Sequence, residues 1–599
     1  MCGIAGIINK NASFVNSKDI KKMTDIISHR GPDGEGHFVY KNIALGHRRL
    51  AILDLSPSGH QPMVNDDYVL VFNGEIYNYI EIKEKLKNIG YVFNTNSDTE
   101  VALKAFQEWG DKCVEEFNGM WSFAIYDKKH NKTFISRDRF GIKPFYYFND
   151  DKTFYFGSEI KQILTFVENP KVNRQVLYDF LYLSYQHYDE NTFFENIKSL
   201  RAGHNLYYNH ETNKIEIKKY YTLKKEDNTY NSLEESVESY KTKFNNSINL
   251  RLRSDVKVGT CLSGGLDSSY VAKTASEKYI NEDKFTAITA KSIDAKNDES
   301  HYAKIVADVY NLNWKITEPS NTDFFNALDD IIYNQEEPFG SPSIIMQYFV
   351  MKKAKEEGCI VMLDGQGGDE TLLGYERYYI PYLNSIKNPI KRISEFRKLS
   401  KNSKLSLKQL LSYYLYFGIP KLREYFLIKK NNYILDKNKK YFNKKLVSEF
   451  KKSSKDLFAL QEKELLELQL EKLLKFEDRN SMAHSIEARV PFLDYKLVEC
   501  ALAIPAKFKI KDGWSKYILR KSYGENAPKE IVWRKNKFGF EAPSKKWMSD
   551  KSLFFKTIKQ SEFLNHVIKK DSALDDLEEN TLWKLFNIAK WAEKFNVSY

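Results

Sequence analysis

The chain has 599 residues, more than a single hydrophobic core supports, so we expect two or more domains. Apolar residues make up 42% and charged residues 29%, with a mean hydropathy of -0.55, as in soluble globular proteins. The net charge of +12 comes from lysines spread through the chain and indicates a solvated face, so we expect no nucleic-acid partner. No apolar run reaches about 18 residues and no signal-peptide pattern is present, so we expect no membrane partner. The five cysteines are far apart and lack a C-x-x-C motif, which predicts a reducing, cytoplasmic location.

Residues 2–220 read as a first domain of short β segments with tight turns. Strands are predicted in the segments 68–79, 120–138 and 213–223, which are rich in apolar residues and separated by turn residues. A helix is predicted over 99–109. This mixture predicts layered sheets with helices outside them. A polar linker is predicted over 221–231.

Residues 232–599 read as a second domain of a different class. Ser232 followed by Glu235 fits a capping box, and a long amphipathic helix should follow it. Buried strands are predicted at 256–262, 285–289 and 359–365, alternating with helices, which indicates a parallel α/β sheet. Residues 376–455 should form a basic helical region within this domain.

Cys2 is a candidate nucleophile because removal of Met1 would leave it with both a thiol and a free α-amine. The amine has a reference pKa of about 7.7–8, so it can take the thiol proton near neutral pH. A cysteine at this position means little by itself, since structural cysteines are usually inert.

The segments around Cys2 change this interpretation. MCGIAGI, HRGPDGEG, GHRRLAILD, FNGEIYN, SDTE and RDRFGIKPFYY follow one another within the first 147 residues. Together they closely resemble the class II glutamine amidotransferase domain, an N-terminal-nucleophile fold. The resemblance covers about the first 205 residues.

That resemblance assigns roles to individual residues. Cys2 would attack the side-chain amide of glutamine, with Asn73 and the backbone N–H of Gly74 as the oxyanion hole. Arg49 would hold the α-carboxylate of glutamine, and Asp98, helped by Glu75, would hold its α-ammonium.

SGGLDSS at 263–269 lies between a predicted strand and a predicted helix. Its glycines let backbone amides approach a phosphate, and the helix N-terminus favours negative charge. Without G-K-[ST] it differs from a Walker A loop and resembles the pyrophosphate loop of the ATP pyrophosphatases. This predicts cleavage of ATP to AMP and pyrophosphate.

DGQGGDE at 364–370, EDRNSMAHSIEARVPFLD at 477–494 and KYILR at 516–520 extend the resemblance to the synthetase domain of glutamine-dependent asparagine synthetases. By that resemblance, residues of three segments would bind ATP: Leu262, Ser263, Gly264, Gly265, Asp267, Ser268, Ile288, Asp364 and Gly365. Asp267 and Asp369 would be the Mg²⁺ carboxylates, and Lys516 would stabilise the α-phosphate. Glu487 and Arg489 would lie near the acceptor, with packing and a turn at RVPFLD as the alternative interpretation.

Gln366 departs from the family pattern, which often has Glu here to form and resolve a β-aspartyl adenylate. Gln keeps the shape but not the charge of Glu. We expect transfer of the glutamine amide nitrogen to the β-carboxylate of aspartate, with glutamine, aspartate and ATP as substrates and Gln366 in the catalytic set. A sugar-acid or peptide carboxylate is the alternative acceptor, and a β-lactam-forming enzyme or a tRNA-modifying protein are further alternatives. The oligomeric state is left open, with a homodimer among the options.

Overall fold

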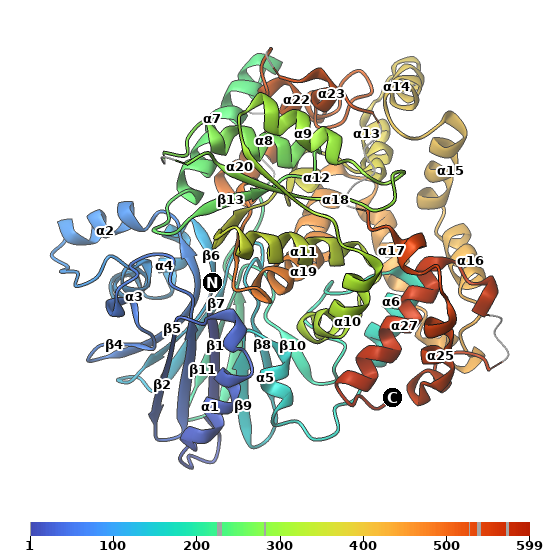
Figure 1. Cartoon of the computed structure of the whole chain (residues 1–599). Coiled ribbons are helices and arrows are strands. Elements are labelled where there is room, and N and C mark those ends of the chain that lie inside the picture. Colours follow the sequence, from blue (N-terminus) through green and yellow to red (C-terminus); the bar gives the residue numbers. More distant parts are fainter. Residues whose placement is uncertain (1, 225–229, 281–282, 526, 536–540, 571–573) are drawn as a thin grey trace.

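The computed structural model describes all residues except 1, 225–229, 281–282, 526, 536–540 and 571–573. Figure 1 shows the strands of the first 220 residues gathered on one side of the molecule, with the later helices around the rest. Residues 225–229 of the predicted linker lie outside the described residues. No helix within them is long and apolar enough to cross a membrane.

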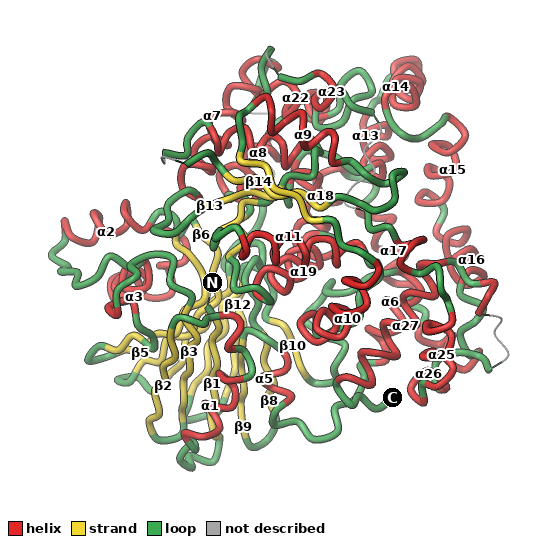
Figure 2. The backbone as a smooth tube through the Cα atoms, in the orientation of Figure 1, coloured by secondary structure: helices red, strands yellow, loops and turns green. Residues whose placement is uncertain are grey.

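Two six-stranded sheets form the first domain (Figure 2). The first has the order β10 (Ile197–Ser199), β8 (Tyr146–Asn149), β9 (Thr153–Gly157), β1 (Gly3–Asn9), β3 (Ile43–Arg49) and β2 (Gly34–Tyr40). The second has the order β12 (Lys214–Lys219), β11 (His204–Asn209), β7 (Lys132–Arg137), β6 (Gly119–Asp127), β5 (Tyr68–Ile76) and β4 (Met63–Val64). Every strand pair in both sheets is antiparallel.

The two sheets pack face to face through a shared apolar core. Ile4 and Leu45 of the first sheet meet Val71 and Ile135 of the second in one buried cluster. A second cluster covers the outer face of the second sheet and includes Val101 of α3 (Asp98–Trp109). Helices therefore lie outside both sheets, and the expected N-terminal-nucleophile sandwich is confirmed. The other helices here are α1 (Ser17–Asp25), α2 (Tyr79–Asn88), α4 (Cys113–Glu116), α5 (Ile160–Leu164) and α6 (Arg174–Leu183).

A five-stranded parallel sheet organises the second domain. Its order is β15 (Asn313–Thr317), β14 (Thr286–Ala290), β13 (Val258–Cys261), β16 (Val361–Leu363) and β17 (Glu487–Arg489), and all its pairs are parallel. The predicted α/β class is confirmed. The chain order reverses between β13 and β16, and the carboxyl ends of strands at such a point form the usual ligand crevice of open α/β sheets.

Helices cover both faces of this sheet and continue beyond it. The helix predicted after Ser232 runs over Leu233–Arg251, and the Ser232 hydroxyl accepts a bond from the Glu235 N–H. The Glu235 carboxylate bonds Asn231 N–H instead of Ser232 N–H, so only half of the predicted capping box forms.

The helices of the second domain, in chain order, are α7 (Leu233–Arg251), α8 (Leu266–Ser276), α9 (Ser300–Val309), α10 (Asn321–Gln335), α11 (Ser343–Glu356), α12 (Gly368–Thr371), α13 (Tyr379–Ser385), α14 (Pro389–Asn402), α15 (Leu407–Gly418), α16 (Pro420–Lys430), α17 (Lys444–Ser453), α18 (Leu457–Lys463), α19 (Leu470–Met482), α20 (Tyr495–Ala503), α21 (Ala506–Lys509), α22 (Tyr517–Ser522), α23 (Lys529–Val532), α24 (Ser544–Trp547), α25 (Ser552–Gln560), α26 (Glu562–Asn565) and α27 (Glu579–Lys594).

The two halves share buried apolar contacts. Met120 and Ile142 of the first half belong to one cluster with Leu474 and Met482 of α19. A second shared cluster joins α6 to α10 and α27, so the C-terminal helix packs on the first domain. The halves are therefore joined by continuous apolar packing.

Candidate functional site

Cys2 lies immediately before β1 and is buried. Its Sγ lies 3.9 Å from the backbone oxygen of Leu50, and burial raises the pKa of the thiol above its usual range. The Cys2 backbone nitrogen donates to Asn73 Oδ1 over 3.1 Å. The thiol is thus fixed next to β5 and needs a base to become a thiolate.

Asn73 and Gly74, the residues predicted to form an oxyanion hole, lie on β5 beside Cys2. The Asn73 amide is fully buried, and with its oxygen taken by Cys2, its Nδ2 has no hydrogen-bond partner among the described residues. A free buried donor beside the thiol can stabilise an oxyanion formed on attack by Cys2. Gly74 lies opposite Trp121, and a Cβ on it would overlap the backbone oxygen of Met120. Only glycine lets β5 and β6 approach this closely.

Arg49 and Asp98 are held by backbone groups. Arg49 donates to the carbonyl oxygens of Ser56, over 2.8 Å, and Asp54, over 2.5 Å, which orients the guanidinium at the end of β3. Asp98 begins α3 and accepts a 2.9 Å bond from the Ile76 N–H at the end of β5. Burial raises the pKa of Asp98 to about 7. The structure therefore brings Cys2, Asn73 and Asp98 to one end of β5.

Glu75 and Arg489 meet across the domain interface. Arg489 Nη2 lies 3.6 Å from Glu75 Oε1, and Arg489 Nε donates to Glu487 over 2.6 Å. Burial and the neighbouring Asp98 carboxyl raise the pKa of Glu75 well above its usual range. Glu487 and Arg489 are fully buried against the first domain and do not line the cavity at the synthetase loop.

The loop after β13 is built around its serines and glycines. Gly264 has φ of +72°, and a Cβ there would lie 2.7 Å from Ala303 N, so this turn requires glycine. The Ser263 and Ser268 hydroxyls lie 2.9 Å apart and close the turn. Gly265 is the N-cap of α8, so the free backbone N–H groups of the first turn of α8 lie next to the loop.

A cavity of about 280 Å³ opens at the reversal point between β13 and β16. Eight predicted residues line it: Ser263, Asp267, Ser268, Ile288, Asp364, Gly365, Gln366 and Asp369. Leu262, Gly264 and Gly265 do not: Leu262 is buried, and its N–H bonds the Ile288 carbonyl over 2.8 Å. Apolar side chains of α19, Leu473 and Phe476, complete one wall.

Lys516 joins the two aspartates predicted to bind a metal. Its Nζ lies 2.6 Å from Asp267 Oδ2 and 2.6 Å from Asp369 Oδ1. The ammonium is buried and comes from a residue with φ of +52°, immediately before α22. Three of the predicted residues therefore form one charged cluster at the cavity.

Sequence reasoning missed Glu477 and Gly374. Glu477 of α19 is buried close to Asp364, and burial raises the pKa of both carboxyls, that of Glu477 well above its usual range. Gly374 lies beside the charged cluster, where a Cβ would overlap Asp369 Oδ1 and Lys516 Cε. Glu477 was within a quoted motif, whereas Gly374 had no pattern that distinguished it from a turn glycine.

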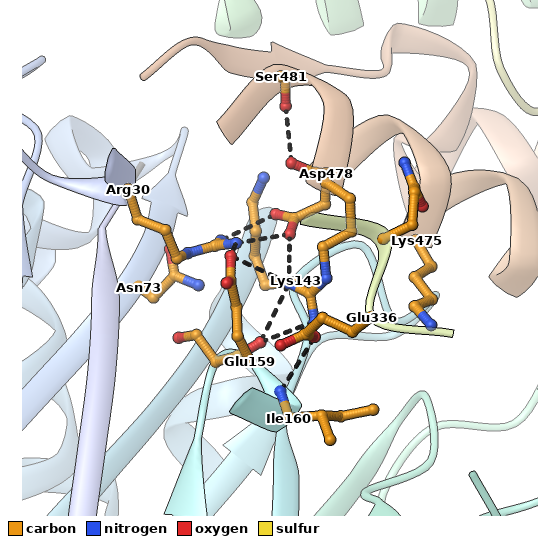
Figure 3. Close-up of polar contacts among 12 residues, drawn as sticks. Arg30, Asn73, Lys143, Glu159, Ile160, Glu336, Lys475, Asp478 and Ser481 are labelled. Carbon is orange, nitrogen blue, oxygen red and sulfur yellow. Dashed lines mark hydrogen bonds and ion pairs between the residues drawn. The ribbon is translucent and has the colours of Figure 1, made fainter. Parts of the chain in front are cut away.

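Arg30 and Asp478 were also missed, and they link the two halves (Figure 3). Arg30 Nε donates to the Cys2 carbonyl oxygen over 3.0 Å. Its Nη1 and Nη2 bond both Asp478 oxygens at 2.8 and 3.0 Å, and Nη1 also bonds Glu159 at 2.9 Å. Arg30 and Asp478 are almost fully buried. The backbone of the candidate nucleophile is thus tied directly to α19.

The fold and these two sites define a glutaminase joined to an ATP-using domain, and the comparisons with known proteins agree. Residues 1–221 match the family model of the glutamine amidotransferase domain, and residues 239–592 match that of asparagine synthase. "Asparagine synthetase [glutamine-hydrolyzing] 1" of Bacillus subtilis is 31% identical over 98% of this chain and 95% of its own length. "Asparagine synthetase [glutamine-hydrolyzing] 3" of the same organism is 30% identical over 97% and 93%. "Putative asparagine synthetase [glutamine-hydrolyzing] 2" of Methanocaldococcus jannaschii is 38% identical over 68% and 81%. The chain belongs to the asparagine synthase family, with an N-terminal glutamine amidotransferase domain.

Proposed function

We propose that this protein is a glutamine-hydrolysing asparagine synthetase. It transfers the amide nitrogen of glutamine to the β-carboxylate of aspartate at the expense of ATP. The observation that carries the proposal is the presence of both sites in one chain, Cys2 with Asn73 in one half and the β13 loop cavity in the other. The names of the relatives favour aspartate over a sugar-acid or peptide carboxylate.

In the glutaminase half, Cys2 attacks the glutamine amide and Asn73 Nδ2 with the Gly74 N–H receives the oxyanion. The α-amine of Cys2, once Met1 is removed, takes the thiol proton and passes it to the departing ammonia. Water then releases glutamate from the thioester. Arg49 holds the α-carboxylate of glutamine and Asp98 its α-ammonium. The backbone bonds that fix Arg49 and Asp98 support these assignments.

In the synthetase half, an oxygen of the aspartate β-carboxylate attacks the α-phosphorus of ATP and pyrophosphate leaves. Ammonia then attacks the acyl carbon and AMP departs, giving asparagine. Ser263, Ser268 and the amides at the start of α8 bind pyrophosphate, and Lys516 stabilises the reacting phosphate. The positions of Ser263 and Ser268 in the cavity wall, and the contacts of Lys516 with Asp267 and Asp369, support these roles. Gln366 lines the same cavity, where its amide can orient the acceptor.

A magnesium ion is part of this proposal. Asp267 and Asp369 both lie at the cavity, each 2.6 Å from the Lys516 ammonium, and are the carboxylates that would hold the ion. Few carboxylates with phosphate oxygens suit Mg²⁺. When bound, Mg²⁺ would neutralise phosphate charge during adenylation.

Ammonia must travel between the halves without being protonated. The apolar packing of Met120 and Ile142 against Leu474 and Met482 supports a passage that excludes water. The bond from Arg30 to the Cys2 carbonyl supports a fixed relation between the thiol and α19.

The proposal is tested by an acceptor screen with ATP, Mg²⁺ and glutamine, in which nucleotide products and pyrophosphate are measured. We expect AMP and pyrophosphate in equal amounts, released in the presence of aspartate. Release of ADP, or no aspartate-dependent pyrophosphate from an enzyme with intact glutaminase activity, would contradict the proposal.

A further inference from the structure

The net positive charge of this protein comes from one region, although lysines occur throughout the chain. Residues 376–455 contain 21 Lys and Arg against 5 Asp and Glu, a difference of +16, whereas the whole chain carries +12. The rest of the molecule is therefore slightly acidic. The excess thus lies in the basic helical region predicted over 376–455.

Exposed apolar side chains are concentrated in the same region. Among the described residues, 23 large apolar side chains are exposed, and nine of them lie between 390 and 426. Leu407, Leu411 and Leu415 follow one another at intervals of four along α15, with 50%, 53% and 44% of their surfaces exposed. That spacing places them on one face of the helix. Ile390 and Ile393 repeat the pattern on α14, at 79% and 57%.

We call these exposed side chains of α14, α15 and the turn into α16 the basic apolar face. Its apolar members are Ile390, Ile393, Leu407, Leu411, Leu415 and Ile419, and its basic members are Lys387, Lys391, Arg397, Lys401, Lys408 and Lys421. The basic members make no ion pair with any residue in the part of the chain that the structure describes. Figure 1 shows α14, α15 and α16 one after another along an outer edge of the molecule.

The combination of exposed cations and exposed aliphatic side chains on the basic apolar face favours one kind of partner. Unpaired cations attract an anionic surface, but phosphate groups of a nucleic acid offer nothing to a row of aliphatic side chains. A second copy of the chain would bring a face of the same charge and be repelled. Two hollows lie beside the face, and Lys387 and Lys391 line one of them. Leu407, Leu411 and Leu415 line neither hollow, so these leucines project outward and do not line a groove.

We propose that the basic apolar face docks on the surface of an anionic phospholipid bilayer. Lysine and arginine would meet the head groups while Leu407, Leu411 and Leu415 enter the boundary of the acyl chains, as in interfacial amphipathic helices. The protein lies on the membrane and does not cross it. The proposal concerns location and is independent of the assigned catalytic activity.

Vesicle flotation tests this docking with the full-length protein. Phosphatidylcholine vesicles are compared with vesicles that also contain phosphatidylglycerol, at low and high salt. We expect flotation with the anionic vesicles alone, reduced at high salt because exposed charges are screened within about 10 Å at 0.1 M ionic strength. Equal binding to neutral vesicles, or no binding to anionic ones, would overturn the proposal.

Two variants separate the contributions of charge and apolar side chains. The triple variant Lys391→Glu, Lys401→Glu, Lys408→Glu should lose flotation, and Leu411→Ser with Leu415→Ser should lower partitioning by about tenfold per leucine. The matched control changes exposed lysines of the first domain, Lys112→Glu, Lys129→Glu and Lys214→Glu, and should float like the wild type.

Glutaminase activity and far-ultraviolet circular dichroism of each variant should equal those of the wild type, which shows that folding is intact. Unchanged flotation of the leucine variant would overturn the proposal. So would binding to duplex DNA that is tighter than binding to vesicles and is unaffected by the leucine substitutions, because either result would show a surface that binds any polyanion.

Discussion

The protonation state of the buried Asp98 carboxyl should make glutamine binding depend on pH. In the empty site, burial raises the Asp98 pKa to about 7, so the group is largely neutral below that pH. Binding the α-ammonium of glutamine requires the carboxylate. We therefore predict that kcat/KM for glutamine falls by about tenfold per pH unit below pH 7, measured as glutamate release.

Ammonia-driven synthesis serves as the control, because it bypasses this site. At a fixed concentration of unprotonated ammonia it should not follow the same pH dependence. The Asp98→Asn variant should bind glutamine weakly at every pH. A wild-type profile that stays flat between pH 5 and 7 would contradict the assigned role of Asp98, since the raised pKa requires the loss in that range.

Gly374 gives a second test at the same scale. A Cβ at this position overlaps side-chain ends of Asp369 and Lys516, which can move, so Gly374→Ala should displace the charged cluster without unfolding the protein. Displacing reacting groups by about 1 Å can cost 10²-fold in rate, and we predict a loss of roughly that size in aspartate-dependent pyrophosphate release.

Glutaminase activity and thermal unfolding of Gly374→Ala should remain near those of the wild type. For comparison, Gly418→Ala has open space around the new Cβ and should leave both activities unchanged. Full pyrophosphate release by Gly374→Ala would show that the geometry of Lys516 and Asp369 does not matter for adenylation.

Single residues were predictable where the motif itself carries the chemistry. Cys2 and Asn73, predicted from motif order, do lie together, and three predicted residues of the 263–269 loop line the cavity while Gly264 and Gly265 do not. Arg30 could not be paired with Asp478, because 448 positions separate them and nothing local connects an arginine to a distant acid. Glu75 was assigned to glutamine, whereas its contact with Arg489 depends on the packing of the two domains.

At the scale of elements, α19 serves both sites. Leu473 and Phe476 line the synthetase cavity, and Asp478 holds Arg30, which in turn bonds the Cys2 carbonyl. A helix is rigid over this distance, so a shift at the cavity reaches the thiol through few contacts. We expect α19 to keep glutamine hydrolysis in step with synthesis.

Asp478→Asn tests this expectation. The substitution keeps the shape of the side chain but removes its charge from a buried pair, and leaving Arg30 without a full partner costs up to about 3–5 kcal/mol. We predict that glutamate release exceeds asparagine formation in this variant, while ammonia-driven synthesis stays close to that of the wild type. Both products are measured in one reaction by chromatography.

Asp494→Asn provides the matched control. Asp494 also bridges the halves while buried, accepting bonds from Asn118 at 2.8 Å and Arg251 at 3.1 Å, but it has no contact with Cys2 or the cavity. Its loss should lower stability and preserve equal amounts of glutamate and asparagine. If Asp478→Asn also keeps the two products equal, α19 does not couple the sites.

Elements were predictable where periodicity is strong and local. The helix predicted over 99–109 is observed over Asp98–Trp109, and the strands predicted around 256–262, 285–289 and 359–365 form β13, β14 and β16. The short strand β17 was not predicted, because its three buried residues, Glu487, Ala488 and Arg489, have no apolar alternation. The order of the strands follows from packing that no local pattern encodes.

At the scale of the whole molecule, two catalytic sites lie in halves that share apolar cores, and a basic edge lies along α14, α15 and α16 (Figure 1). The shared cores include α6 of the first domain and α27 at the C-terminus. Such extensive packing fixes the halves relative to each other. This arrangement favours direct transfer of ammonia over its release to solvent.

Transfer of an isotope-labelled amide nitrogen tests the central claim most directly. The protein is incubated with amide-labelled glutamine, aspartate, ATP and Mg²⁺ in the presence of unlabelled ammonium, and asparagine is analysed by mass spectrometry. We predict labelled asparagine, formed in equal amount with AMP, and loss of the label in Cys2→Ala with synthesis from ammonium retained. Labelled asparagine from Cys2→Ala, or pyrophosphate release without any labelled asparagine from the wild type, would contradict the account.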